Sequence, residues 1–137
     1  FKILSNLASK YSVTIVQENV NLFRSSDPCF IKDMRNYLKN DVKFVLDIKQ
    51  CIRSGYSPFD ILNAMENNIA LVHISDNNIK NDCIPPGQGN FDFLKLKNLL
   101  LKNKYQGDII IELYNSGFKN LDELWNSYLY LKKLFDA

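Results

Sequence analysis

Four residues able to bind a metal ion or transfer a proton each stand directly behind a short apolar run. Three carboxylates and one imidazole form a mostly oxygen ligand set, which favours a hard or borderline divalent ion with open positions for substrate oxygens. Such an ion holds two adjacent oxygens of a sugar and stabilises an enediolate, while a carboxylate on each side of the reacting carbon removes and returns a proton. The four residues are Glu18, after residues 13–17; Asp47, after residues 42–46; His73, after residues 69–72; and Glu112, after residues 109–111.

The apolar runs are predicted strands, and each is separated from the next by a helical pattern. Continuous apolar strands that alternate with helices favour an α/β fold with a parallel sheet. Two architectures fit this order: a doubly wound open sheet, or part of a (β/α) barrel. The predicted helices are the tail of one helix in residues 1–10, then residues 27–38, 48–52, a helix from residue 57, residues 91–102, and a last helix over about residues 120–134. Asp27 with Pro28 predicts a helix start, Gly55 a helix stop, and Asn120 with Glu123 a capping box at the start of the last helix.

A barrel would bring the four residues together, because the carboxyl ends of its strands meet at one rim. Each residue alone has a structural interpretation: Asp47 as a helix cap, Glu18 as a solvated loop acid, and His73 as a hydrogen-bonded core residue. Only 15 acidic residues and one histidine occur among 137 residues. Since strand boundaries are uncertain by about two residues, four such strand ends arise by chance on the order of once in 250 sequences. The set therefore predicts a site.

The composition, with 46% hydrophobic residues and a formal charge of +2, indicates one globular domain over residues 1–137. This balance offers no electrostatic footprint for nucleic acid or an anionic membrane, and no apolar run reaches the length of a membrane span. Cys29, Cys51 and Cys83 form no C-x-x-C pair, as expected of free thiols in the cytoplasm. The sequence opens with residues 1–4 as if inside a helix, which is expected of a segment of a longer protein.

At these positions the sequence resembles the xylose isomerase-like TIM-barrel superfamily, in particular its sugar phosphate isomerase/epimerase branch of the AP endonuclease family 2 type. The His-Ile-Ser-Asp segment followed by Pro-Gly-Gln-Gly is the most specific part of the resemblance. The matching segments are Ile15–Asn19, Phe44–Asp47, Val72–Asp76, Pro86–Asp92 and Ile110–Tyr114.

The resemblance implies the C-terminal half of a (β/α)8 barrel, with four parallel βα units equivalent to the fifth to eighth strands. It also implies that Glu18, Asp47, His73 and Glu112 bind one divalent ion (Mn, Mg, Co or Zn), and that Glu18 and Glu112 serve as the acid/base pair of a sugar or sugar phosphate isomerase or epimerase. A half barrel has two open strand edges. We therefore expect self-association or docking with a missing N-terminal half-barrel.

The sequence departs from the family pattern at two places that affect the substrate. Gln50 stands where relatives often have a histidine, and Asp82–Ile84 stand where many have a histidine or arginine. Gln50 can still contact a sugar hydroxyl, and Gln88 is the second candidate substrate-binding residue. With one histidine in the chain, the three-zinc site of the DNA-cutting branch is disfavoured. The alternatives are an AP-endonuclease-like phosphodiesterase and a non-catalytic interaction module. Trp125 and Tyr128 of the last helix are expected to pack inside.

Overall fold

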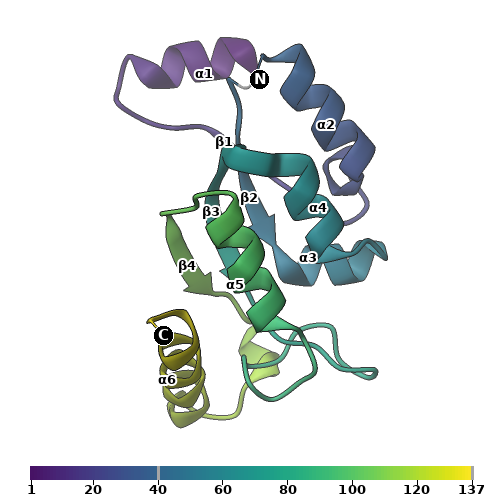
Figure 1. Cartoon of the computed structure of the whole chain (residues 1–137), viewed down its shortest axis with the longest axis vertical. Helices are drawn as coiled ribbons and strands as arrows, with labels where there is room; N and C mark the ends of the chain where they lie inside the picture. Colours follow the sequence, from purple (N-terminus) through teal and green to yellow (C-terminus); the bar gives the residue numbers. More distant parts are fainter. Residues whose placement is uncertain (40, 137) are drawn as a thin grey trace.

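The computed structural model describes residues 1–39 and 41–136, which form one parallel sheet with helices and connecting loops (Figure 1). None of the described helices is long and apolar enough to span a bilayer. The strands are β1 (Val16–Glu18), β2 (Lys43–Asp47), β3 (Ile69–Ile74) and β4 (Asp108–Ile111). The helices are α1 (Lys2–Ser9), α2 (Pro28–Tyr37), α3 (Ile48–Ser54), α4 (Pro58–Met65), α5 (Phe93–Lys102) and α6 (Leu121–Asp136), with the short 3-10 turns η1 (Arg24–Ser26), η2 (Glu66–Asn68) and η3 (Asn115–Gly117).

The strand order decides between the two architectures that the sequence left open. The sheet runs β1-β2-β3-β4, and every neighbouring pair is parallel. A doubly wound sheet reverses its strand order at a switch point, whereas a barrel places each strand beside the next one in sequence. The fold is therefore the α/β fold of half a TIM barrel, as the family resemblance implied.

The helices cover one face of the sheet. Helix α2 packs on α4, α4 on β2 and α5, and α5 on α6, so that the helices form a row along that face (Figure 1). Phe44 and Leu46 of β2 and Val72 and Ile74 of β3 are fully buried in the core beneath them. Successive side chains of a strand point to opposite faces. Asp47 and His73 therefore share the face turned away from the helices.

The signals that start and stop helices behave as the sequence predicted. The Asp27 side chain accepts a hydrogen bond from the backbone N–H of Cys29 at 2.8 Å and caps α2, which begins with Pro28. Gly55 has a φ of +75° and ends α3. A left-handed residue at this position is the usual helix stop, and glycine adopts it without a steric penalty. These signals place α3 directly behind the end of β2.

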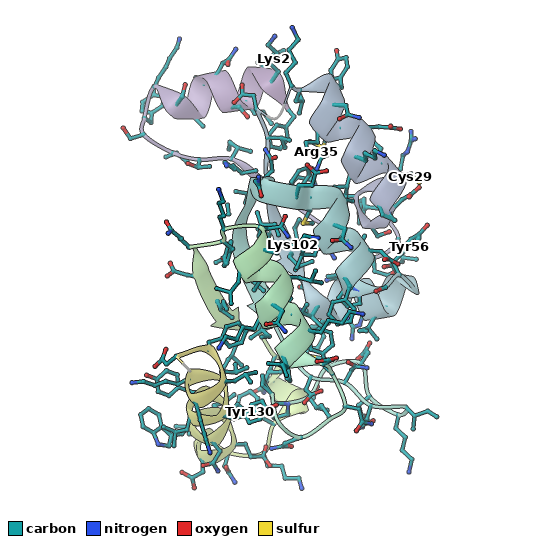
Figure 2. All side chains as sticks on the ribbon, in the orientation of Figure 1. Lys2, Cys29, Arg35, Tyr56, Lys102 and Tyr130 are labelled. Atoms are coloured by element: carbon teal, nitrogen blue, oxygen red, sulfur yellow. The ribbon has the colours of Figure 1, made fainter. Side chains whose placement is uncertain are left out.

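One buried cation fixes the helix row. Arg35 extends from α2 toward α4 (Figure 2), where it donates to the carbonyl of Ala64 at 3.0 Å and to Glu66 Oε1 at 2.8 Å. The arginine side chain is almost fully buried, whereas the glutamate is exposed. This contact ties the end of α4, just ahead of β3, to α2.

Three local expectations differ from the structure. The first strand covers only Val16–Glu18 instead of residues 13–17, because among the described residues it pairs with β2 alone. Glu123 accepts from the N–H of Lys119 at 2.7 Å, so only the Asn120 half of the expected capping box forms. Trp125 is 60% exposed and Tyr128 is 43% exposed, so the expectation that both pack inside was wrong for the structure as described.

Candidate metal centre

The four predicted residues come together at the carboxyl ends of the strands. Glu18 and Asp47 are the last residues of β1 and β2, His73 lies near the end of β3, and Glu112 directly follows β4. One ligand atom from each side chain lies within 4.8 Å of those from all the others. Asp47 and His73 are direct partners in the parallel register of β2 and β3. The convergence that the barrel predicted is therefore present.

Three of the atoms that face the centre of this cluster form no hydrogen bond. His73 Nδ1 lies 3.0 Å from Glu112 Oε2, 3.8 Å from Glu18 Oε1 and 3.9 Å from Asp47 Oδ2. Within the described residues, three buried atoms of the cluster have no hydrogen-bond partner: Asp47 Oδ2, His73 Nδ1 and Glu112 Oε2. Buried polar atoms are normally satisfied. Three unsatisfied ligand atoms aimed at one point fit a bound cation.

Asp47 serves the helix and the cluster at once. Its Oδ1 accepts from the N–H of Gln50 at 3.0 Å and caps α3, which leaves Oδ2 to face the cluster. The interpretation of Asp47 as a helix cap is thus confirmed, and the second oxygen leaves room for the predicted role as a metal ligand. Because the cap fixes the carboxylate, Oδ2 is held in place before any ligand arrives.

Asn19 is a supporting residue to which sequence reasoning assigned no role. Its side-chain amide donates to the carbonyl of Asp47 at 3.0 Å, and its Oδ1 accepts from the N–H of Asp47 at 2.8 Å. Asn19 is almost fully buried and follows Glu18 directly. It therefore joins the end of β1 to the end of β2 and sets the spacing between Glu18 and Asp47. Its signals in the sequence are its place next to Glu18 and its inclusion in the Ile15–Asn19 segment of the family resemblance.

Lys49 is a second residue that sequence reasoning missed. Its Nζ lies 3.4 Å from Asp47 Oδ2 and 3.1 Å from Glu112 Oε2, and its side chain is only 4% exposed. Burial lowers the pKa of Lys49, but the charges of Asp47 and Glu112 outweigh this effect, so its pKa is raised above the ordinary value. A positive charge is thus part of the cluster. Its position in the first turn of α3 follows from the sharp passage from β2 into this helix.

The carboxyl groups of Asp47 and Glu112 interact, and their pKa values are shifted in opposite directions. Burial, followed by the interaction with Glu112, raises the pKa of Asp47 to about 7. Burial also acts to raise the pKa of Glu112, but its interactions with Asp47 and Lys49 outweigh this and lower it. Such a pair titrates as a unit. A divalent ion at this place would displace the proton from Asp47.

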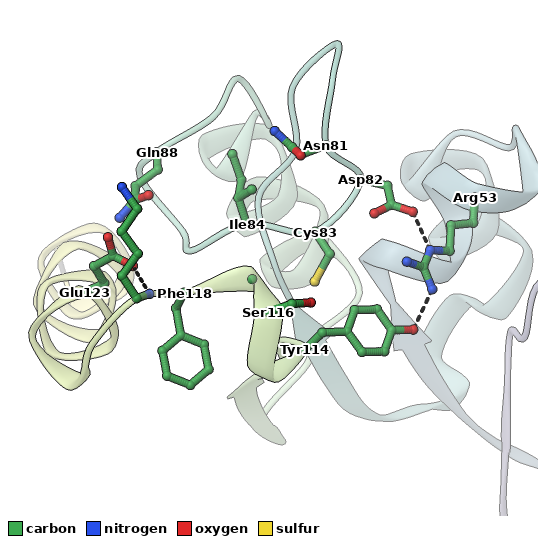
Figure 3. Close-up of a pocket in the computed structure, with 12 residues that line it drawn as sticks. Arg53, Asn81, Asp82, Cys83, Ile84, Gln88, Tyr114, Ser116, Phe118 and Glu123 are labelled. Carbon is green, nitrogen blue, oxygen red and sulfur yellow. Dashed lines mark hydrogen bonds and ion pairs between the residues drawn. The ribbon is translucent and has the colours of Figure 1, made fainter.

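The two predicted substrate residues lie apart from each other. Gln50 Oε1 accepts from the N–H of Asn21 at 3.0 Å, so this carbonyl fixes the loop after β1. Gln88 lines a separate pocket of about 400 Å³ beside Asn81, Asp82 and Tyr114 (Figure 3). The geometry therefore does not gather Gln50 and Gln88 at one place.

Arg53 and Tyr114 connect this pocket to the cluster. Arg53 donates to Asp82 and to the hydroxyl of Tyr114 (Figure 3), and the ring of Tyr114 lies over Lys49 Nζ at 4.8 Å from the ring centre. Tyr114 follows Glu112 by two residues. Tyr114 therefore both lines this pocket and covers the side chain of Lys49.

The Pro-Gly-Gln-Gly segment is shaped by a buried carboxylate. Asp76 accepts from the N–H groups of Gly87 at 3.0 Å, Gly89 at 2.8 Å and Phe91 at 2.9 Å. A Cβ on Gly89 would meet Asp76 Oδ1 and the carbonyl oxygen of Asn77 at 2.4 Å. The segment that gave the most specific resemblance thus has a structural explanation, and it places Gln88 at the pocket.

One protein family matches the part of the chain that contains the site and its supporting loops. Residues 1–134 match the family described as "Xylose isomerase-like TIM barrel". The chain belongs to this xylose isomerase-like family. No curated protein matches the chain in sequence.

Solved structures of the same fold include sugar epimerases. The 3-keto-D-glucoside 4-epimerase YcjR from E. coli is similar at 20% identity and a TM-score of 0.73, over 96% of this chain and 50% of that one. A D-psicose 3-epimerase solved with D-fructose gives 17% identity and 0.73, over 98% and 53%. The D-psicose 3-epimerase of Clostridium cellulolyticum H10, solved with D-tagatose, gives 14% and 0.74, over 96% and 53%. This member of the xylose isomerase-like family thus spans about half the length of these enzymes.

Proposed function

We propose that this chain is the metal-binding half of a divalent-metal-dependent sugar or sugar phosphate isomerase or epimerase. One observation carries the proposal: ligand atoms of Glu18, Asp47, His73 and Glu112 lie within 4.8 Å of one another at the carboxyl ends of four parallel strands. Three of these side chains direct a buried atom without a hydrogen-bond partner at the common point. The names of the epimerases with the same fold support the sugar substrate.

The donor set fits one divalent ion held by all four residues. Oxygen and imidazole ligands accept Mn, Mg, Co or Zn. A bound ion of this kind supplies Lewis-acid stabilisation of the negative charge that develops on an enediolate. The residues present therefore match the ion that the family resemblance implied.

Exposure separates the roles of the three carboxylates. The side chain of Asp47 is 1% exposed, whereas those of Glu18 and Glu112 are 33% and 40% exposed. Glu18 ends β1 and Glu112 directly follows β4, and these are the two outermost strands. They can reach a substrate carbon from opposite sides, so that one removes a proton and the other returns it. Asp47 serves only to bind and position.

Metal binding is the first test of this function. We expect the wild-type chain to bind one Mn²⁺ per molecule, and Glu18→Gln and His73→Ala each to weaken binding at least about tenfold, since each removes one of four ligands. The free Mn²⁺ signal in electron paramagnetic resonance measures this affinity. Asp33→Asn, at an exposed position in the middle of α2 away from the cluster, is the matched control and should bind like wild type.

The alternatives predict other results. A non-catalytic interaction module would be indifferent to both ligand substitutions. Cleavage of abasic DNA that stops on zinc chelation would favour the endonuclease interpretation instead. The presence of Gln50 and Cys83, where that branch needs further histidines, argues against this second outcome.

A further inference from the structure

The metal centre described above already contains one cation that belongs to the protein. Lys49 Nζ lies 3.4 Å from Asp47 Oδ2 and 3.1 Å from Glu112 Oε2. These are two of the three buried atoms that face the cluster without a hydrogen-bond partner. The lysine therefore approaches the same oxygens that a bound metal ion would use.

The place of this ammonium group is built into the structure. The ring of Tyr114 contacts both Lys49 and Arg53, with Nζ of the lysine at 4.8 Å and Cζ of the arginine at 4.7 Å from its centre. Arg53 also donates to the Tyr114 hydroxyl and to Asp82 (Figure 3), which fixes the ring over the lysine. A lysine that only filled space would not need this cover, because long basic side chains usually reach water.

We propose that Lys49 is an internal counter-ion of the metal centre, which shares the Asp47 and Glu112 oxygens with the bound ion and thereby sets its affinity. This inference rests on the proposed function. The three carboxylates bring three negative charges, the lysine one positive charge, and a divalent ion two more. With Lys49 the loaded centre is neutral, and without it the centre carries one negative charge. A neutral centre accommodates an enediolate better than a negative one.

The same charge has a cost for metal binding. Two cations in a partly buried site repel each other, and they draw on the same oxygens. Lys49 also keeps two carboxylates close together before the ion arrives, which favours binding. Repulsion from a divalent ion is the larger effect, because ordering one carboxylate side chain costs little by comparison. Removal of the lysine charge should therefore tighten metal binding.

The test compares Mn²⁺ affinity in four variants of the chain. Lys49→Met and Lys49→Gln remove the charge at similar length, Lys49→Arg retains it, and Lys43→Met makes the same change at the start of β2, away from the site. We expect Mn²⁺ to bind both uncharged variants about tenfold or more tightly than wild type. Lys49→Arg and Lys43→Met should stay within about threefold of wild type. Thermal unfolding with and without Mn²⁺ is the second measurement, and the uncharged variants should gain more from the ion.

The outcomes separate this inference from the proposed function. Equal or weaker Mn²⁺ binding by both uncharged variants, beside a wild type that binds, overturns the counter-ion role alone. Failure of both uncharged variants to fold even with Mn²⁺ also overturns it, because the ion should replace the ammonium group. If wild type and every variant bind no Mn²⁺, the proposed metal function fails and the inference fails with it. Binding by the uncharged variants but not by wild type supports the inference most strongly.

Discussion

At the scale of single residues, Asp47 shows why a helix cap and a metal ligand need not be alternatives. A strand that passes directly into a helix needs a side chain that accepts from the first free N–H groups. Asp47 uses one oxygen for this purpose and presents the other to the cluster. Since every helix behind a barrel strand begins near the rim, a capping carboxylate there is already placed to bind a ligand.

Proton competition at Asp47 predicts how metal affinity depends on pH. A metal ion at the proposed centre would bind Asp47 as the carboxylate, but burial and Glu112 raise the pKa of Asp47 to about 7. Below pH 7 a proton must leave before the ion binds. We therefore expect Mn²⁺ affinity to fall about fivefold from pH 7 to pH 6, to approach a tenfold loss per pH unit below about pH 6, and to level off toward about pH 8. Titrations at half-unit steps of pH measure this slope. Asp33→Asn should reproduce the curve of wild type. A Mn²⁺ affinity that does not change between pH 5.5 and pH 8 would contradict the competition.

The sequence predicted the four cluster residues but not the residues that support them. Glu18, Asp47, His73 and Glu112 were found because their types bind metals and because strand ends in a barrel share one rim. Lys49 has the sequence features of a surface lysine in a helix, and only the packing of Tyr114 over it makes it a buried charge. Asn19 has the features of a loop residue. Its role depends on the side-by-side pairing of β1 and β2, which no local pattern contains.

At the scale of elements, the loop between β3 and α5 depends on one buried carboxylate. Asp76 is 1% exposed and accepts from four backbone N–H groups, those of Asn77, Gly87, Gly89 and Phe91. Bonds from neutral donors to a charged acceptor are stronger than neutral ones. The loop is therefore a fixed wall of the pocket that holds Gln88, although its sequence has the proline and glycine content of a turn.

Gly89 gives a direct test of that wall. A Cβ at this position would meet Asp76 Oδ1 and a backbone oxygen at 2.4 Å, and the backbone oxygen cannot move aside cheaply. We expect Gly89→Ala to lower the free energy of unfolding by about 2–3 kcal/mol, since it displaces Asp76 from its hydrogen bonds. Urea denaturation measures the loss. Gly55→Ala, which has open space around its Cβ but a φ of +75°, should cost less, about 1 kcal/mol; an equal cost for the two would contradict the clash.

Element boundaries were predicted best where a cap or a partner strand fixes them. Asp27 and Gly55 mark their helices correctly because their effect is local. The first strand was predicted too early, over residues 13–17, because its β-branched residues all favour extended structure. Strand pairing, which is not local, selects only Val16–Glu18 of this stretch. As a result Glu18 lies inside the strand and points to the inner face.

At the scale of the whole molecule, the sheet ends at β1 and β4, the two outermost strands of its order. Ile110 in the middle of β4 is 46% exposed. On α6, the side chain of Trp125 is also exposed. The chain covers only 50–53% of the epimerases with the same fold. An exposed strand edge beside apolar side chains is a template for pairing with another chain. We therefore propose that four further βα units cover these edges in the active form, and that a second copy does so when this chain is alone.

This proposal predicts self-association of the isolated chain. We expect light scattering after size exclusion to give a mass above that of one chain, rising with concentration, together with binding of an apolar dye to the exposed inner face. Ile110→Glu places a charge on the edge strand and should shift the chain toward monomer, because burying an unpaired carboxylate against a partner costs several kcal/mol. Leu101→Glu on α5, at a comparably exposed site, is the matched control and should leave the mass unchanged. A wild-type chain that runs as a single monomeric species and binds no dye would show that its edges need no cover, and the half barrel would then be a complete folding unit.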